Sequence, residues 1–180
     1  LGKVTVAKEV VRLLGELGSE AYPDLLALDR GDLHRDVRIA LLRALWDHLD
    51  REETWAIFER AATGADWVVA SRLGDVPPGR LSAAAERRLT RLVVTLFGRP
   101  EPEARLDLLK RAATLPLSDP DRVLFDGLLG VVSAGKVAEA ELAWDAVRTR
   151  LWPRDVAGVA TLFTAKATNR RWLSAILAVT

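Results

Sequence analysis

Proline and glycine divide this 180-residue sequence into short apolar-periodic segments, and that punctuation most limits what the chain can fold into. Neither residue sits comfortably inside a helix, so each marks a break. Every proline falls in a gap between periodic segments or within the first two positions of the next segment: Pro23, Pro77, Pro78, Pro100, Pro102, Pro116, Pro120 and Pro153. The segments between breaks predict about eleven helices, near 3–17, 23–30, 34–49, 52–62, 66–74, 81–97, 101–114, 119–134, 137–151, 154–167 and 170–180.

The sequence predicts no strands. No segment alternates apolar and polar residues between hairpin turns, and the gaps are too short to hold strands of useful length. We therefore expect an all-α fold.

The segment 34–49 is apolar around most of its helical circumference. Its apolar residues form two stripes: Val37, Leu41, Ala44, Leu45 and His48 in one, and Ile39, Leu42, Trp46 and Leu49 in the other. A helix with one apolar stripe lies on a surface, whereas a helix apolar on several sides packs on several sides. Stacked helix pairs create that environment, because each helix contacts its own partner and the neighbouring pairs.

Short motifs recur along the chain. The segment 57–63 returns in similar form as 108–114, and each copy is followed by an aspartate that we expect near a helix start, Asp66 and Asp121. The sequence Arg35-Asp36-Val37 likewise returns at 154–156. Aspartate near a helix N-terminus caps free N–H groups. A spacing of roughly 30 to 37 residues between helix pairs is typical of repeat arrays.

Residues 25–28, 31–32 and 36–45 together resemble one HEAT repeat. They read as a short helix, an acidic turn and a second helix that opens with Val37-Arg38 and carries small residues and leucines. The resemblance extends loosely over most of the chain, and a diverged armadillo-like or bacterial HEAT-like array is the alternative. It implies a right-handed α-solenoid, a single unit over 1–180, in which the second helix of each pair lines a concave surface.

The same resemblance implies specific roles. Asp32 and Arg38 match the spacing of the aspartate and arginine that bridge adjacent HEAT repeats, whereas Phe125 occupies the arginine position of a later unit. The implied function is a non-enzymatic scaffold that binds a protein or peptide, with no catalytic residue and no cofactor. Neither terminal segment shows the polar outer face that caps a repeat array. We therefore expect a segment of a longer protein, in contact with flanking repeats of the same chain.

Composition narrows the setting. The chain has no cysteine, no signal-peptide pattern and no apolar run long enough for a membrane span, so we expect a cytoplasmic protein. Lysine appears at only five positions among 26 basic residues, an arginine bias that indicates a high-GC bacterial genome. The net charge of +1 is not typical of a nucleic-acid-binding domain.

Candidate chemistry is sparse. His34 and His48 do not have metal-ligand spacing, and we expect a surface position for His34 and a partly buried, hydrogen-bonded position for His48. No phosphate-binding loop or nucleophile elbow is present. The acidic pairs Glu52-Glu53 and Asp119/Asp121 lie at predicted helix starts, where capping accounts for them.

The alternative function is a nucleic-acid-binding module related to the HEAT-like DNA glycosylases. Six tryptophans suggest it, and Asp47 and Asp145, which adjoin Trp46 and Trp144, would be the first carboxylates to consider. We favour a core position for these rings. Arginine clusters form the candidate binding surface: Arg35, Arg43, Arg87, Arg88, Arg91, Arg148, Arg150 and Arg154.

Overall fold

The computed structural model describes residues 2–30, 32–77, 79, 81–134 and 136–164, and within these ranges the chain is helical with no strand. The α-helices are α1 (Gly2–Leu17), α2 (Tyr22–Ala27), α3 (Arg35–Ala44), α4 (Glu52–Thr63), α5 (Trp67–Ser71), α6 (Ala83–Leu96), α7 (Pro102–Ala112), α8 (Val123–Ala134), α9 (Val137–Arg148) and α10 (Val156–Thr164). The 3-10 helices are η1 (Gly18–Ala21), η2 (Leu45–His48), η3 (Arg72–Gly74) and η4 (Pro153–Asp155). The predicted all-α class is confirmed for this part of the chain.

The number of helices differs from the prediction of about eleven. Each of the first ten predicted segments contains an α-helix, and the predicted helix 170–180 lies outside the described residues. Across the described ranges, no helix combines the length and the apolar character needed to cross a bilayer.

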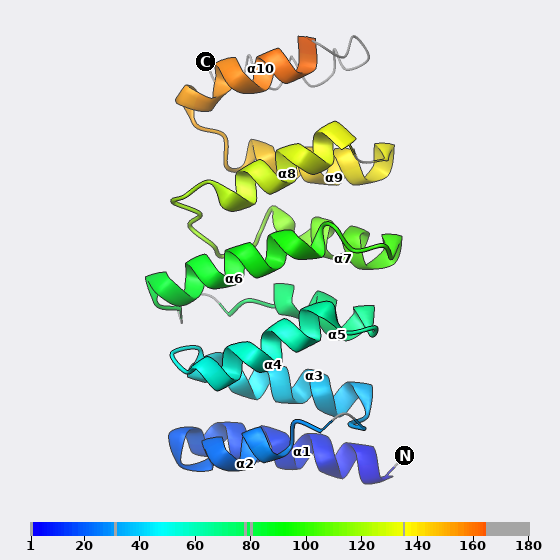
Figure 1. Ribbon diagram of the computed structural model, residues 1–180, viewed down its shortest axis with the longest axis vertical. Coiled ribbons are helices and arrows are strands. Elements are labelled where there is room, and N and C mark those ends of the chain that lie inside the picture. The colour runs from blue at the N-terminus through cyan, green and yellow to red at the C-terminus, as the bar shows by residue number, and fades with distance from the viewer. Residues whose placement is uncertain (1, 31, 78, 80, 135, 165–180) are drawn as a thin grey trace.

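The helices lie in two layers. Among the odd-numbered helices, α3 contacts α1 and α5, and α7 contacts α5 and α9; among the even-numbered helices, α6 contacts α4 and α8. Figure 1 shows the helix pairs stacked along the long axis, with α1 and α2 at one end and α10 at the other. The hydrophobic core runs the length of the stack between the layers.

Both apolar stripes predicted for 34–49 are used in this core. Val37, Leu41 and Leu45 of one stripe are buried, as are Leu42 and Trp46 of the other. The segment is an α-helix to Ala44 and tightens into η2 over its last turn. A helix enclosed on several sides needs this apolar circumference.

Capping residues set several helix starts. The Asp66 carboxylate accepts from the N–H of Val68 at 3.1 Å and from that of Val69 at 3.5 Å, which confirms its predicted position before α5. Ser82 caps α6 through the N–H of Ala85. These side chains satisfy N–H groups that have no partner within the helix.

The predicted start of a helix at 119 is wrong, because α8 begins at Val123. Asp119 has φ 49° and Arg122 has φ 60°, which are left-handed values that a right-handed helix cannot include. The buried Asp119 carboxylate instead accepts from the N–H of Leu124 at 2.9 Å and of Phe125 at 2.8 Å. Asp119, rather than Asp121, therefore caps α8.

Candidate interaction groove

Two adjoining hollows on the odd-numbered layer form a groove along α1, α3 and α5. The larger hollow, about 750 Å³, is lined by Thr5, Lys8, Glu9, Arg12, Gly15, Glu16, Gly18, Ala40, Arg43, Ala44 and Asp47. The smaller, about 510 Å³, is lined by Lys8, Arg35, Asp36, Ile39, Ala40, Arg43, Val68 and Arg72. Three residues line both hollows, so they are continuous, and we call them together the α1–α3–α5 groove.

Small residues set the depth of this groove. Gly15 of α1 faces Ala44 of α3 so closely that a Cβ added at Gly15 would lie 3.0 Å from the Ala44 Cβ. Ala40 lies one turn earlier on α3 and lines both hollows. Gly15, Ala40 and Ala44 therefore form the floor of the groove. The longer charged side chains that line the hollows form its walls.

The α1 wall carries an arginine between two glutamates. Arg12 pairs with Glu9 at 2.6 Å and also with Glu16. The hydrogen bond from Arg12 is the largest influence on the Glu9 carboxyl and holds its pKa below the ordinary value. The same contacts raise the pKa of Arg12.

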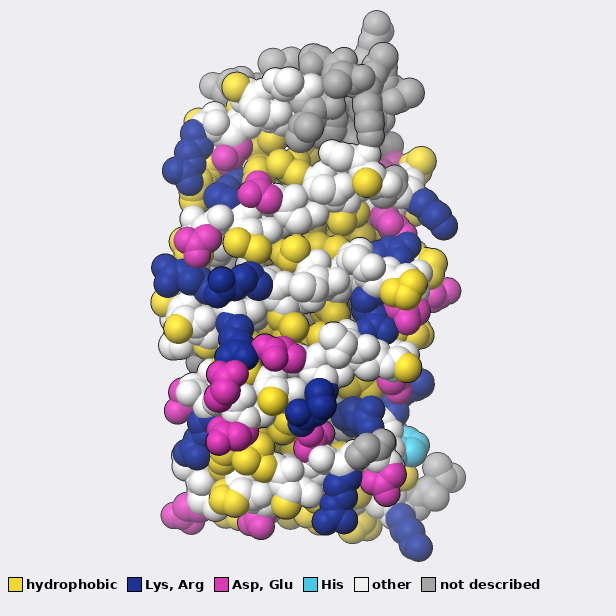
Figure 2. All heavy atoms as spheres, in the orientation of Figure 1, with side chains coloured by type: hydrophobic (Ala, Val, Ile, Leu, Met, Phe, Trp, Pro, Cys, Tyr) yellow, Lys and Arg dark blue, Asp and Glu magenta, His cyan; other side chains and the backbone are white. Residues whose placement is uncertain are grey.

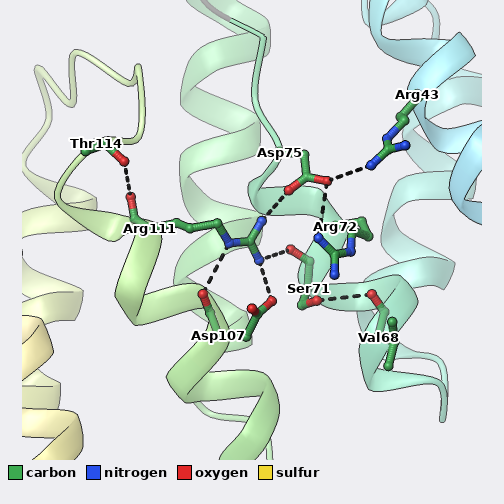
Figure 3. A network of polar contacts seen from close by, with 8 residues as sticks. All are labelled: Arg43, Val68, Ser71, Arg72, Asp75, Asp107, Arg111 and Thr114. Atoms are coloured by element: carbon green, nitrogen blue, oxygen red, sulfur yellow. Dashed lines mark hydrogen bonds and ion pairs between the residues drawn. The ribbon is translucent and has the colours of Figure 1, made fainter.

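The α3 and α5 walls carry arginines that have carboxylate partners at the ends of α5 and η3. Arg35 pairs with Asp66 at 2.6 Å, and Arg43 lies 3.5 Å from Asp75. Arg72 lies 3.7 Å from the same Asp75 carboxylate. Figure 3 shows Arg43 and Arg72 pointing toward Asp75 together with Arg111 of α7, so one carboxylate joins three successive helices of the layer.

Two charged residues of the groove are left for a ligand. Within the part of the chain that the structure describes, the side chains of Lys8 and Asp36 make no ion pair or hydrogen bond. Both are exposed and both line the smaller hollow. The groove therefore offers one ammonium group and one carboxylate beside its small-residue floor.

The predicted arginine surface is not assembled as one patch. Arg35 and Arg43 meet in the groove, whereas Arg87 and Arg88 on α6 pair with Asp121 at 3.0 Å and with Glu52 at 2.6 Å. Arg88 also stacks over the Trp55 ring. The hydrogen bond from Arg88 lowers the pKa of Glu52. Arg91 is exposed near Arg87.

The remaining three arginines lie near the other end of the stack. Arg148 pairs with Asp145 on its own helix at 3.0 Å, and Arg154 stacks over the Trp152 ring at 4.1 Å. Arg150 donates to the carbonyl oxygens of Leu117 and Leu115, both at 2.9 Å. Burial lowers the pKa of Arg150, and its position closes the turn between α7 and α8.

Asp32 and Arg38, the two residues of the predicted inter-repeat pair, lie before α3 and on α3. Asp32 is exposed in the turn before α3, and Arg38 is half-buried on α3, where it lines a small hollow with Asp29 and Arg60. Asp29, which follows α2, and Arg60 of α4 form an ion pair beside them. The inter-repeat role of Asp32 and Arg38 stays a prediction.

As far as the structure describes the chain, neither histidine has the surroundings of a metal ligand or a catalytic group. His34 is exposed and accepts from the N–H of Asp36, as expected for a helix start. His48 is only 3% exposed, and its Nε2 has no hydrogen-bond partner among the described residues, so the expected hydrogen bond is absent at that atom. Its ring lies 4.8 Å from that of Tyr22. The described residues contain no cluster of metal-ligating side chains.

The predicted core position is confirmed for Trp46, Trp55 and Trp144, whereas Trp67, beside Asp66, is half-buried and Trp152 is 38% exposed. Trp46 packs edge-on against Phe58 at 5.0 Å, and Trp144 is also buried. Asp47 and Asp145 are exposed on the other side of the backbone. Neither buried ring can stack on an extruded base, which a glycosylase platform requires. Trp172 lies outside the described residues.

The sequence contains a signal for the groove that apolar periodicity does not reveal. Lys8, Arg12 and Glu16 recur every four residues, a spacing that places them on one face of α1. The face that Figure 2 shows has basic and acidic side chains interspersed rather than gathered in an area of one sign.

Comparisons of the chain with protein-family models, with curated proteins and with solved structures found no match.

Proposed function

We propose that this chain is a right-handed, HEAT-like α-solenoid that binds a protein or peptide segment in the α1–α3–α5 groove and catalyses no reaction. The observation that carries the proposal is the groove itself, which runs across three successive helices of one layer. Helices α3 and α5 are the second helices of the pairs α2–α3 and α4–α5, and the HEAT resemblance assigns ligand binding to that layer.

The charges of the groove support a peptide ligand. Lys8 and Asp36 provide one cation and one anion for opposite charges on a ligand, whereas Arg12, Arg35 and Arg43 already have carboxylate partners. Paired arginines offer little net attraction to a polyanion, because the local positive field is cancelled. A peptide with charges of both signs fits this arrangement better than a nucleic-acid backbone.

The test uses peptides selected on the whole 180-residue chain from a random display library. Their affinity is then measured by fluorescence anisotropy for Lys8→Glu and for the matched control Lys110→Glu, an exposed lysine on α7. We expect Lys8→Glu to weaken binding about tenfold, the effect of replacing an attractive charge with a repulsive one. Equal effects of the two variants would place the ligand elsewhere.

Nucleic acid remains the competing ligand class. We expect only weak, salt-sensitive association with duplex DNA and no release of alkylated bases. A gel-shift titration at physiological salt and a base-release assay measure these two properties. Submicromolar specific binding, or measurable base release, would favour the nucleic-acid function over the peptide function.

A further inference from the structure

Helix α1 carries an exposed apolar stripe at the end of the stack. Val6, Val10, Leu13 and Leu17 are 63%, 45%, 47% and 63% exposed. Four of the six large exposed hydrophobic residues among the described residues are in this one helix. A contiguous patch of this kind marks an interaction site, whereas single exposed apolar side chains are normal.

The stripe faces away from the other described helices. At 100° per residue the four side chains fall within about 60° of arc, on the opposite side of α1 from Gly15. Gly15 contacts Ala44 of α3, the next helix of the layer. Figure 1 shows α1 at the end of the stack, so this side of the helix has no neighbour among the described residues.

The stripe is complementary to itself. Its four residues are symmetric about a point between Val11 and Arg12, so two antiparallel copies of α1 would place Val6 against Leu17 and Val10 against Leu13. A two-fold interface requires this property, because the same patch must match itself.

The charges at the two ends of the stripe are complementary as well. Lys3 lies at the N-terminal end of α1, and Glu20 lies just beyond its C-terminal end in η1. Both are exposed, and neither has an ion pair within the described ranges. The antiparallel arrangement that matches the apolar residues also brings each Lys3 near the Glu20 of the other copy.

We propose that two copies of this protein dimerise through antiparallel pairing of their α1 stripes. The dimer interface is separate from the α1–α3–α5 groove, which lies on another side of α1. This proposal therefore does not depend on the proposed peptide function.

The first test is the molar mass of the 180-residue chain, measured by light scattering after gel filtration and by sedimentation equilibrium. We expect a dimer at micromolar concentration. Leu13→Glu places a charge against Val10 of the other copy and should weaken the dimer about 30-fold or more. The control Val137→Glu changes an apolar residue that is 78% exposed on α9 and should change the dissociation constant by no more than about twofold. Circular dichroism checks that each variant folds.

A second test examines the antiparallel geometry. The chain has no cysteine, so single introduced thiols report on contacts cleanly. A mixture of Val6→Cys and Leu17→Cys chains should form a disulfide-linked heterodimer under mild oxidation. Either variant alone should not, because residues 6 of the two copies would lie about 16 Å apart along the helix axis, well beyond disulfide reach.

Charge reversal tests the ends of the stripe. Lys3→Glu and Glu20→Lys should each weaken the dimer about threefold, and the double variant should restore it, as expected for exposed ion pairs. A monomeric wild-type chain would overturn the proposal. A helix other than a second copy of α1 would then cover the stripe. Rapid crosslinking of Val6→Cys chains alone would overturn the antiparallel arrangement.

Discussion

Arg105 of α7 donates to the carboxylate of Glu139 in α9 at 2.8 Å, and both side chains are largely removed from water. Arg105 also donates to the carbonyl oxygen of Arg99, so it connects two helices of one layer with the turn that precedes α7. Each charge has lost most of its contact with water and is stabilised by the other charge instead. Removing one partner therefore leaves the other as an unpaired buried charge.

Arg105→Ala should lower the free energy of unfolding by about 3 kcal/mol, because it leaves the buried Glu139 charge without its partner. The matched control is Arg148→Ala, which removes the exposed pair with Asp145 on α9 and should cost less than about 1 kcal/mol. Urea denaturation followed by tryptophan fluorescence measures both. Equal costs would show that burial does not strengthen the Arg105–Glu139 pair.

The Asp119 cap gives a second prediction. Asp119→Ala should cost about 2 kcal/mol, since it removes two hydrogen bonds to N–H groups of α8 and places alanine at a positive φ. Asp119→Asn should cost less, because asparagine tolerates this φ and keeps one acceptor oxygen. Thermal unfolding by circular dichroism ranks the two variants. A larger loss for the asparagine variant would contradict the capping role.

Two aspartates test which carboxylates hold successive helices of the stack together. Asp75→Ala should cost about 2 kcal/mol, because it removes the carboxylate shared by Arg43, Arg72 and Arg111. The HEAT resemblance predicts a cost of about 0.5 to 2 kcal/mol for Asp32→Ala, with peptide binding unchanged. Chemical denaturation gives both values. If Asp32→Ala leaves the stability unchanged but abolishes peptide binding, Asp32 contacts the ligand instead of holding the helices together.

Asp66 predicts a dependence of stability on pH. Burial raises the pKa of its carboxyl, but the hydrogen bond and charge of Arg35 and the N–H groups of Val69 and Val68 outweigh burial, so the pKa is lowered overall. The resulting stabilisation is complete above the unfolded-state pKa of about 3.9 and is lost as the pH falls through the lower folded-state value.

Asp66→Asn should therefore be less stable than the wild type at pH 6, and the difference should shrink as the pH falls below about 4. Urea unfolding at a series of pH values measures the two slopes. Asp50→Asn, at an exposed aspartate that has no ion pair among the described residues, serves as a control for loss of a carboxylate. A difference between Asp66→Asn and wild type that stays constant with pH would show that the Asp66 carboxyl does not titrate in this range.

The sequence by itself determined the helical class and most helix positions. Prolines interrupt the N–H pattern locally, and apolar periodicity depends only on residues within the same helix, so both can be read without knowing the fold. This is why α4, α6 and α9 lie close to their predicted ranges. The exception, the start of α8, depends on positive φ values at Asp119 and Arg122 that no periodicity reveals.

Only the tertiary structure decided the partners of the arginines and the position of the groove. Arg35 and Asp66, or Arg88 and Glu52, lie more than a helix apart in the sequence, and they meet because the helix pairs stack in one register. An arginine near an aspartate in sequence has no preference for that aspartate over one in the next helix pair, since long side chains reach several partners. The close approach of Gly15 to Ala44 likewise depends on how α1 packs on α3, which neither helix encodes alone.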